Sequence, residues 1–224
     1  MSTLLAFDTA TEACSVALDL NGDISSEWAL IPRQHSEQIL PMIDRLLASA
    51  GITLSQVDAI AFGRGPGAFT GVRIATAIVQ GLAFAADKPV VPVSTLAALA
   101  QQAVRRHRAQ KILAAIDARM DEVYWAGYEV VDDALVEVVT EQVCAPELVQ
   151  LPACRDGWVG VGTGWGFSDR IALLPDRVEV DVYPHAEDIV RLAQPSFCRG
   201  EAVEASLALP VYLRNQVAKK RHER

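Results

Sequence analysis

Two aspartates are the first candidates for chemistry, because each ends a short apolar segment of the kind that forms a buried strand. Asp8 ends TLLAFD and Asp117 ends KILAAID. Carboxylates at strand ends that face a common cleft can hold Mg²⁺ and, through it, a nucleotide phosphate. The next residues are Thr9 and Ala118, so no glycine lets the backbone close on a phosphate. A strand-end acid also commonly caps a turn, and both roles stay open here.

A glycine-rich segment, residues 63–73 (GRGPGAFTGVR), joins an apolar strand segment to a helix. Glycine permits backbone angles that are closed to other residues, and the free N–H groups of a helix start often hold phosphates. The segment matches neither GxxxxGK[ST] nor GxGxxG, and no phosphate-directed lysine follows it. Thr70 is the expected N-cap of the helix. A structural turn and a contact to an anion or a partner are therefore both open.

The histidines and cysteines predict no metal site. A second ligand on the same helix face as His35 would stand four residues later, and that residue is Ile39. His35 is therefore expected to be a cap or a surface residue. The four cysteines are widely spaced without a Cys-x-x-Cys pair, which is typical of reduced thiols.

Composition narrows the classes of function. The chain has 224 residues, of which 51% are hydrophobic, and a formal net charge of −8. This charge argues against a dominant nucleic-acid surface, which needs clustered Lys and Arg. The basic residues 219–224 are expected to be a solvated, disordered terminus, with RNA or an acidic partner as the alternative contact. No apolar run reaches about 18 residues and no secretory signal is visible, so we expect a cytoplasmic protein without membrane contact.

The elements that position these residues follow from hydrophobic periodicity and turn signals. The Asn21-Gly22 pair between two strand segments is a strong hairpin signal. The first half is predicted as β-β-β-α-β-α-β-α, over residues 3–8, 13–20, 24–31, 35–50, 57–63, 71–86, 89–93 and 95–107. On helix 95–107, Gln101, Gln102 and Arg105 are expected to face away from an apolar stripe.

The second half repeats this opening. Its strands are predicted at 111–117, 122–130, 135–143, 157–163 and 178–183, with helical pieces near 146–151 and 186–194. Asp8 and Asp117 then end corresponding strands. This recurrence predicts two related α/β domains, each with a mixed sheet and crossover helices. We place them at residues 1–108 and 109–224.

Helix 71–86 is apolar almost all round, and Arg73, Thr76 and Gln80 form its narrow polar stripe. A sheet covers only one side of such a helix, so the other side is expected to meet another element or another chain. Helix 35–50 is its expected neighbour. A subunit interface is predicted here, with a purely internal contact as the alternative. Its residues are Ile39, Met42, Ile43, Leu46, Ala75, Ile78, Gly81 and Leu82.

Several segments together resemble the bacterial TsaB family, also called YeaZ. They are LLAFDTATEACSVAL, GRGPGAFTGVRIA, PVVPVSTLAALA, DARMDEVYWAGY and PVYLRN. The resemblance implies an actin-like ATPase (ASKHA, ribonuclease H-like) fold of two related βββαβα-type domains. It also implies a non-catalytic part in making N6-threonylcarbamoyladenosine at position 37 of tRNAs that read codons beginning with A. The implied partners are a catalytic paralogue, TsaD, and an ATPase, TsaE, with a homodimer forming when TsaD is absent.

The catalytic paralogue holds its metal with a His-x-x-x-His pair, whereas His35 is followed by Ile39. The superfamily also places glycine after the strand-end acid, where this chain has Thr9. We therefore expect no catalytic residue, no metal and no tightly bound cofactor, while ATP or ADP at a shared subunit interface and contact with tRNA stay open. The candidates for nucleotide contact are Asp8, Asp117, Arg119, Gly162 and Gly164.

Two other classes of function are kept in view. One is a stand-alone ATP-dependent kinase with the same fold, which would need intact phosphate loops. The other is a metallopeptidase, against which the missing histidine and the absence of His-Glu-x-x-His argue.

Overall fold

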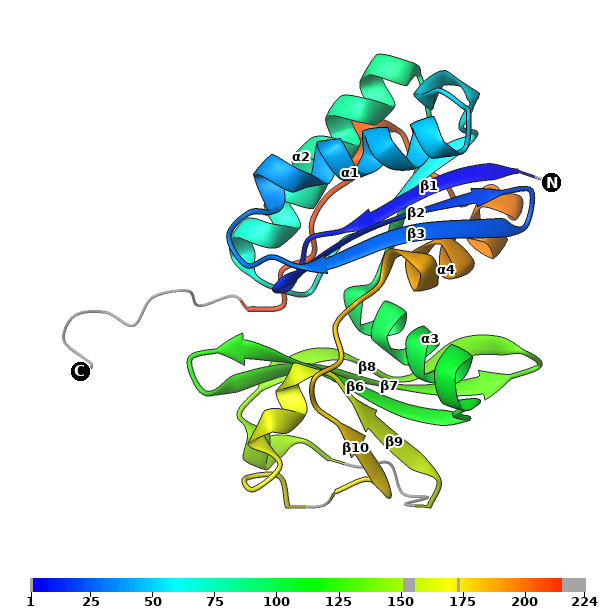
Figure 1. The fold of residues 1–224 in the computed structure, drawn as a ribbon. Coiled ribbons are helices and arrows are strands. Elements are labelled where there is room, and N and C mark those ends of the chain that lie inside the picture. Colours follow the sequence, from blue (N-terminus) through cyan, green and yellow to red (C-terminus); the bar gives the residue numbers. More distant parts are fainter. Residues whose placement is uncertain (1, 151–155, 173, 215–224) are drawn as a thin grey trace.

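The computed structural model describes residues 2–150, 156–172 and 174–214, and the basic segment 219–224 lies outside them. These residues form two mixed five-stranded sheets, one above the other in Figure 1. The first sheet has the order β3-β2-β1-β4-β5. Its strands are β1 (Thr3–Asp8), β2 (Ala13–Leu20), β3 (Asp23–Leu30), β4 (Ala59–Gly63) and β5 (Val90–Val93).

The second sheet has the order β10-β9-β6-β7-β8. Its strands are β6 (Lys111–Arg119), β7 (Glu122–Val131), β8 (Ala134–Cys144), β9 (Trp158–Val161) and β10 (Arg177–Glu179). Read from its other edge, this is the order of the first sheet, and in both sheets the three opening strands are antiparallel and the others parallel. The predicted recurrence of elements is confirmed.

Tight turns join the antiparallel strands as the sequence predicts. Asn21 and Gly22 both have positive φ, and so do Asp132 and Asp133 in the equivalent hairpin. Such angles at both central residues give the turn whose twist matches a strand pair. The two halves differ in their helices. In the places where the first half has α1 (His35–Ser49) and α2 (Phe69–Ala86), the described residues of the second half form short 3₁₀ helices, at Pro146–Leu148 and Thr163–Phe167.

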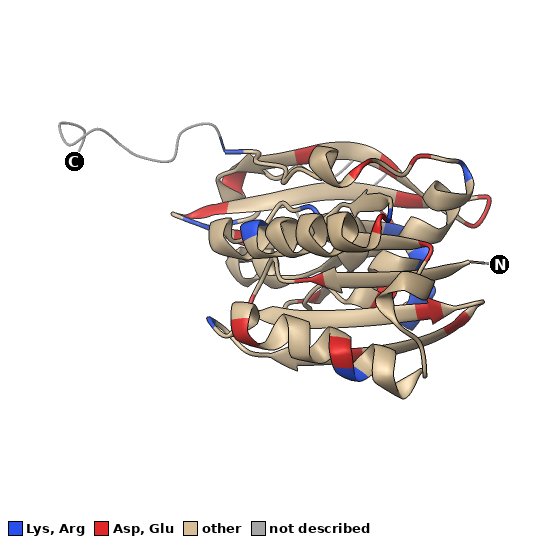
Figure 2. Cartoon of the chain, turned by 90° about the horizontal axis from the view of Figure 1, so that it is seen from above, with Lys and Arg blue, Asp and Glu red and all other residues tan. Residues whose placement is uncertain are grey.

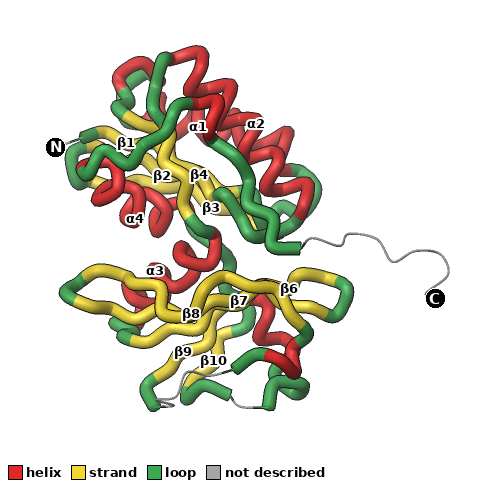
Figure 3. The backbone as a smooth tube through the Cα atoms, turned by 180° about the vertical axis from the view of Figure 1, so that it is seen from behind, coloured by secondary structure: helices red, strands yellow, loops and turns green. Residues whose placement is uncertain are grey.

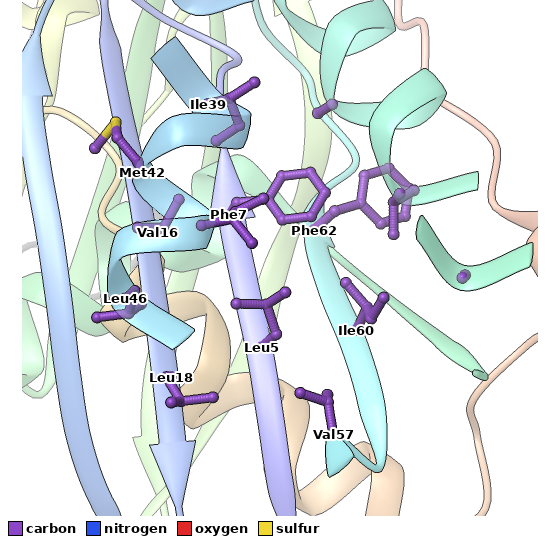
Figure 4. Packing of buried hydrophobic residues seen from close by; sticks show 14 of the residues in the cluster. Leu5, Phe7, Val16, Leu18, Ile39, Met42, Leu46, Val57, Ile60 and Phe62 are labelled. Atoms are coloured by element: carbon purple, nitrogen blue, oxygen red, sulfur yellow. The ribbon is translucent and has the colours of Figure 1, made fainter. Parts of the chain in front are cut away.

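Helices α1 and α2 cover one face of the first sheet. Figure 4 shows how Ile39, Met42 and Leu46 of α1 pack on the side chains of β1, β2 and β4. Because α1 places its apolar side chains three and four residues apart, they form one stripe that fits this sheet face.

The two remaining helices lie between the sheets (Figures 1 and 3). Helix α3 (Thr95–His107) follows the first sheet in sequence but packs on the second, against Ile112, Ala114 and Val161. Helix α4 (Ala186–Cys198) follows the second sheet but packs on the first, against Leu4, Ala61 and Val91. Each helix therefore completes the core of the other half, so packing crosses the division placed at residue 108.

This crossing corrects the expectation for the polar side of α3. Gln102 is buried, and Arg105 donates two hydrogen bonds of 2.8 Å to the buried carboxylate of Asp188 on α4. The polar face does point away from the apolar stripe, but toward α4 and not toward solvent. Side chains that a single domain would leave in contact with water therefore form an internal contact between α3 and α4.

The chain finally returns along α2. Gln80 donates to the carbonyl of Ala208, and Arg73 donates to the hydroxyl of Tyr212 at 2.8 Å while stacking on Phe69. Two residues of the predicted polar stripe, Arg73 and Gln80, thus bind residues 208–212, while the hydroxyl of Thr76 donates to the carbonyl of Val72 within the helix.

Helix α2 is the one element among the described residues that is long and apolar enough to cross a membrane, with a mean hydropathy of 1.4 over 18 residues. The sequence reading did not anticipate this. One such helix is weak support for a membrane, because core helices of soluble proteins meet the same criterion.

Candidate functional site

Asp8 lies at the end of β1 but not in an open cleft. Its side chain is 1% exposed, Oδ1 accepts a hydrogen bond from the N–H of Ala10, and Oδ2 has no partner among the described residues. A Cβ on Gly63 would stand 1.8 Å from Oδ2, so β4 seals the carboxylate. Burial raises the pKa of Asp8 to about 7. Contact between Asp8 and a nucleotide would therefore need β4 to move away from the carboxylate, and this contact stays a prediction.

The glycine-rich loop packs against the turn that follows Asp8. A Cβ on Gly67 would stand 2.4 Å from the carbonyl oxygen of Ala10, and one on Gly71 2.1 Å from that of Thr9. The N–H of Ala68 donates to the carbonyl of Ala10, and the hydroxyl of Thr9 donates to that of Gly71. The glycines are therefore needed for close approach of two backbone segments. Of the two roles considered from the sequence, this supports the structural turn.

The start of α2 differs from the prediction by two residues. Its N-cap is Ala68, without a side-chain cap, and Thr70 belongs to the first turn. The backbone contact between Ala68 and Ala10 fixes where the helix begins, and this contact outweighs the capping preference of Thr70.

Gly162 and Gly164 have the same role in the second half. Gly162 has φ +106°, and a Cβ there would stand 2.2 Å from the carbonyl oxygen of Ala115 on β6. A Cβ on Gly164 would meet Ala115 and the nitrogen of Ile116, each at less than 3.0 Å. The backbone of β6 packs closely on both glycines, which explains why glycine is needed there, and nucleotide contact at these two positions stays a prediction.

Asp117 and Arg119, two of the candidates for nucleotide contact, bind each other, and Arg119 also reaches across to the first half. The guanidinium of Arg119 donates to Asp117 Oδ2 at 2.8 Å and to Glu12 Oε1 in the turn after β1. Arg119 is itself largely exposed. These three charges form an ion cluster at the junction of the two halves. Arg64 and Glu141 of β8 form a separate ion pair between the halves.

A pocket of about 360 Å³ opens beside Arg119. It lies between the start of α1, the start of α2 and the turn after β1. Among the residues that line it are Thr11, Arg33, His35, Ser36, Thr70 and Arg119. Two side chains that sequence reasoning singled out, Arg119 and His35, therefore share one pocket.

His35 is neither a cap nor a surface residue. It is buried, and its Nε2 lies 3.2 Å from the carbonyl oxygen of Ala13. Ile39, one turn later, is in the core. Within the described residues, no three side chains of the His, Cys, Asp and Glu types lie close enough together to hold a metal ion.

The predicted interface residues divide between two sides of the helices. Ile39, Met42, Ile43, Leu46 and Ala75 are 0–4% exposed and belong to the core of the first half (Figure 4), so their assignment to a partner surface is corrected. The apolar stripe of α1 identified a buried face, but periodicity does not say whether a sheet or a partner covers it.

Ile78, Gly81 and Leu82 lie on the outer side of α2, where Gly81 is exposed and the other two are half-buried. The same side exposes Ala77, Ala85 and Phe84, the last of them 86% exposed. We call the set Ala77, Ile78, Gly81, Leu82, Phe84 and Ala85 the outer face of α2. Seen from above, this helix is almost free of charge (Figure 2), and Arg73 is its one charged residue.

Comparisons with known proteins agree with this architecture. Residues 29–156 match the model of the family described as "TsaD: tRNA N6-adenosine threonylcarbamoyltransferase". The chain is 45% identical to the "tRNA threonylcarbamoyladenosine biosynthesis protein TsaB" of Escherichia coli K12, covering 97% of each chain. It is 44% identical to the protein of the same name from Haemophilus influenzae, covering 98% of this chain and 96% of the relative.

Among solved structures, YeaZ from Pseudomonas aeruginosa superposes with a TM-score of 0.93 at 54% identity, covering 95% of this chain and all of the other. Together with the two mixed sheets, these matches confirm the actin-like (ASKHA, ribonuclease H-like) α/β fold.

Proposed function

The chain belongs to the TsaB family of bacterial proteins, also called YeaZ, and on that premise we propose that it takes part in forming N6-threonylcarbamoyladenosine in tRNA. As the resemblance implies, the modified base is adenosine 37 of tRNAs that read codons beginning with A. The reaction takes place in the cytoplasm.

Its role is that of a partner subunit and not of an enzyme. Two positions support this. The carboxylate of Asp8 is sealed beneath Gly63, and that of Asp117 is held by Arg119. The equivalent acids of an active ATPase of this fold must reach Mg²⁺ or a phosphate, and neither is free to do so without rearrangement.

The outer face of α2 is the observation that carries the proposal. It sets Phe84 and several small side chains on one exposed helix surface without a charge. A surface of this kind is typical of a protein interface, and its small residues allow another helix to approach closely. The catalytic subunit is a TsaD-like paralogue, a second copy of this chain occupies the face in isolation, and a TsaE-like ATPase joins the assembly.

Any ATP or ADP at the shared interface would contact this chain more readily through Arg119 and the adjoining pocket of about 360 Å³ than through Asp8, Gly162 or Gly164. The net charge of −8 places most contacts with tRNA phosphates on the partner.

Reconstitution with a TsaD-like and a TsaE-like protein tests the proposal. Threonylcarbamoyl transfer to tRNA should require this chain, and the chain alone should show no transfer and no Mg²⁺-dependent ATP turnover above about 1 s⁻¹. Turnover by the chain alone that Asp8→Ala abolishes would establish a kinase or ATPase instead. Zinc-dependent cleavage of peptides would establish a metallopeptidase.

A further inference from the structure

A second pocket, of about 200 Å³, lies on the molecule where β3, α3 and the segment before α4 meet. It is lined by Trp28, Gln102, Arg106, Asp181, Val182, Tyr183 and His185. None of these residues lines the pocket beside Arg119 or belongs to the outer face of α2. Nothing in the proposed function uses it.

An orphaned amide forms the floor of this pocket. Gln102 is 2% exposed, and its Oε1 has no hydrogen-bond partner among the described residues. A buried acceptor without a partner destabilises the folded state, and a ligand that donates to it removes that cost. The last torsion of a glutamine side chain is broad, so the amide can turn either its oxygen or its NH₂ group toward a ligand.

Two aromatic side chains form the walls. The rings of Trp28 and Tyr183 have centroids 6.4 Å apart and planes inclined at 50°. The two rings are tilted and do not stack face to face, and both line the pocket. Trp28 is 42% exposed, so the indole is accessible from solvent. Stacking on such rings is the usual way in which proteins hold a single base.

The rim supplies a donor and balanced charges. The Nδ1 of His185 accepts a hydrogen bond of 3.1 Å from the N–H of Glu187, so in the neutral ring the proton is on Nε2. Burial lowers the pKa of His185, which keeps the ring neutral at pH 7. Arg106 and Asp181 contribute one charge of each sign.

We propose that this pocket binds one neutral, planar, hydrogen-bonding ring of the nucleobase class, stacked on Trp28 and bonded to Gln102. The volume admits one ring system, because pockets for larger ligands are about 300–1,000 Å³. The charges of the rim cancel, which disfavours an anion or a cation. A purely apolar ring would leave the amide of Gln102 unsatisfied, so the ligand needs polar edges. A free nucleoside and a base of single-stranded RNA share this chemistry.

Tryptophan fluorescence measures binding directly, since Trp125, Trp158 and Trp165 are buried and Trp28 alone of the four is exposed. Titration of the full chain with adenosine, guanosine, cytidine and uridine should give a saturable change for at least one, and ribose should give none. Gln102→Leu keeps the reporter and should weaken this binding about tenfold while melting at the same or a higher temperature.

Gln101→Leu is the matched control, because it is the neighbour of Gln102 on α3 and does not line the pocket. It should bind like the unchanged chain. A short single-stranded RNA that binds more tightly than any nucleoside, and is weakened by Gln102→Leu, would identify RNA as the source, whereas equal binding would identify a free nucleoside. No saturable change with any nucleoside, or equal losses in the two leucine variants, would overturn the proposal.

Discussion

Asp8 is the residue at which expected chemistry and observed environment differ most. Within the described part of the chain, its carboxyl group forms no ion pair and one of its oxygens has no hydrogen-bond partner. Because burial places its folded-state pKa at about 7, above the ordinary 3.8, the folded chain holds the extra proton between these pH values. The free energy of unfolding therefore falls as the pH rises from about 4 to 7.

Asp8→Asn removes this titration and keeps an oxygen for the N–H of Ala10. The variant should gain more stability at pH 8 than at pH 5, with a difference of about 3 kcal/mol between the two gains, which corresponds to two pKa units. Urea unfolding at both pH values measures it. An equal effect at the two pH values would show that Asp8 is charged in the folded protein.

The sequence predicted correctly that Asp8 ends β1 and that Asp117 lies on the equivalent strand, but β6 continues two residues beyond Asp117, to Arg119. It could not predict that the carboxylate of Asp8 is sealed while that of Asp117 is partly exposed. That difference depends on the parallel pairing of β1 with β4, which brings Gly63 against Asp8, and no local pattern encodes a contact between segments so far apart.

At the scale of elements, the glycines of α2 are of two kinds. A Cβ on Gly71 would stand 2.1 Å from a backbone oxygen, whereas a Cβ on Gly81 would meet nothing within 4 Å. Gly71→Ala should therefore destabilise the chain by roughly 2 kcal/mol or more, as overpacking does. Gly81→Ala should stabilise it by about 1 kcal/mol, since alanine is the better helix former.

Thermal melting of both variants tests this contrast. Opposite shifts of the melting temperature are expected. Equal shifts would mean that the glycine-rich loop, residues 63–73, moves away from Thr9 easily. The close packing of this loop on Thr9 would then not define where α2 begins.

The two sides of α2 should also respond differently to charge. Ala75→Glu places a carboxylate in the core and should unfold the chain, because a buried unpaired charge costs several kcal/mol. Ala77→Glu, two residues away on the outer face, should melt normally and lose self-association by orders of magnitude, since the charge is desolvated only on pairing.

Sedimentation of the Ala77→Glu variant, alone and with a TsaD-like partner, measures the second effect. A variant that melts normally and still pairs would place the interface elsewhere. The sequence could identify α2 as unusually apolar, but only the fold separates Ala75 from Ala77, because the assignment depends on which side faces β4.

At the scale of the whole molecule, the two halves are held together by α3 and α4. Arg105 and Asp188 join these helices, and Asp188 is fully buried. Arg105→Met should cost about 3–5 kcal/mol because it leaves the carboxylate unpaired. Adding Asp188→Asn should restore most of this loss.

Arg191→Met is the control, because the exposed pair that Arg191 forms with Glu187 is its one ion pair among the described residues, and losing it should cost less than about 1 kcal/mol. Denaturant unfolding of Arg105→Met, of the double variant with Asp188→Asn, and of Arg191→Met measures these changes in the free energy of unfolding. If Arg105→Met costs no more than Arg191→Met, the contact between α3 and α4 does not hold the halves together.

The order of elements, read from the sequence, predicted both sheets and their repetition, because strands and turns are local signals. The exchange of α3 and α4 could not be predicted in this way. Both helices carry an apolar stripe, and a stripe does not say which of two sheets will cover it; that depends on the path of the chain after β5 and β10.

This exchange has a consequence for synthesis on the ribosome. The face of the first sheet that α4 covers stays bare until Ala186–Cys198 have left the exit tunnel, long after β5 has been made. At 5–20 residues per second, the roughly hundred intervening residues take about 5–20 s. The nascent chain thus displays Leu4, Ala61 and Val91 to its surroundings for that time. Folding of the N-terminal half is therefore complete only after the C-terminal half has been translated. On a stalled ribosome, the apolar face of the first sheet would stay exposed, and general chaperones bind exposed apolar surface.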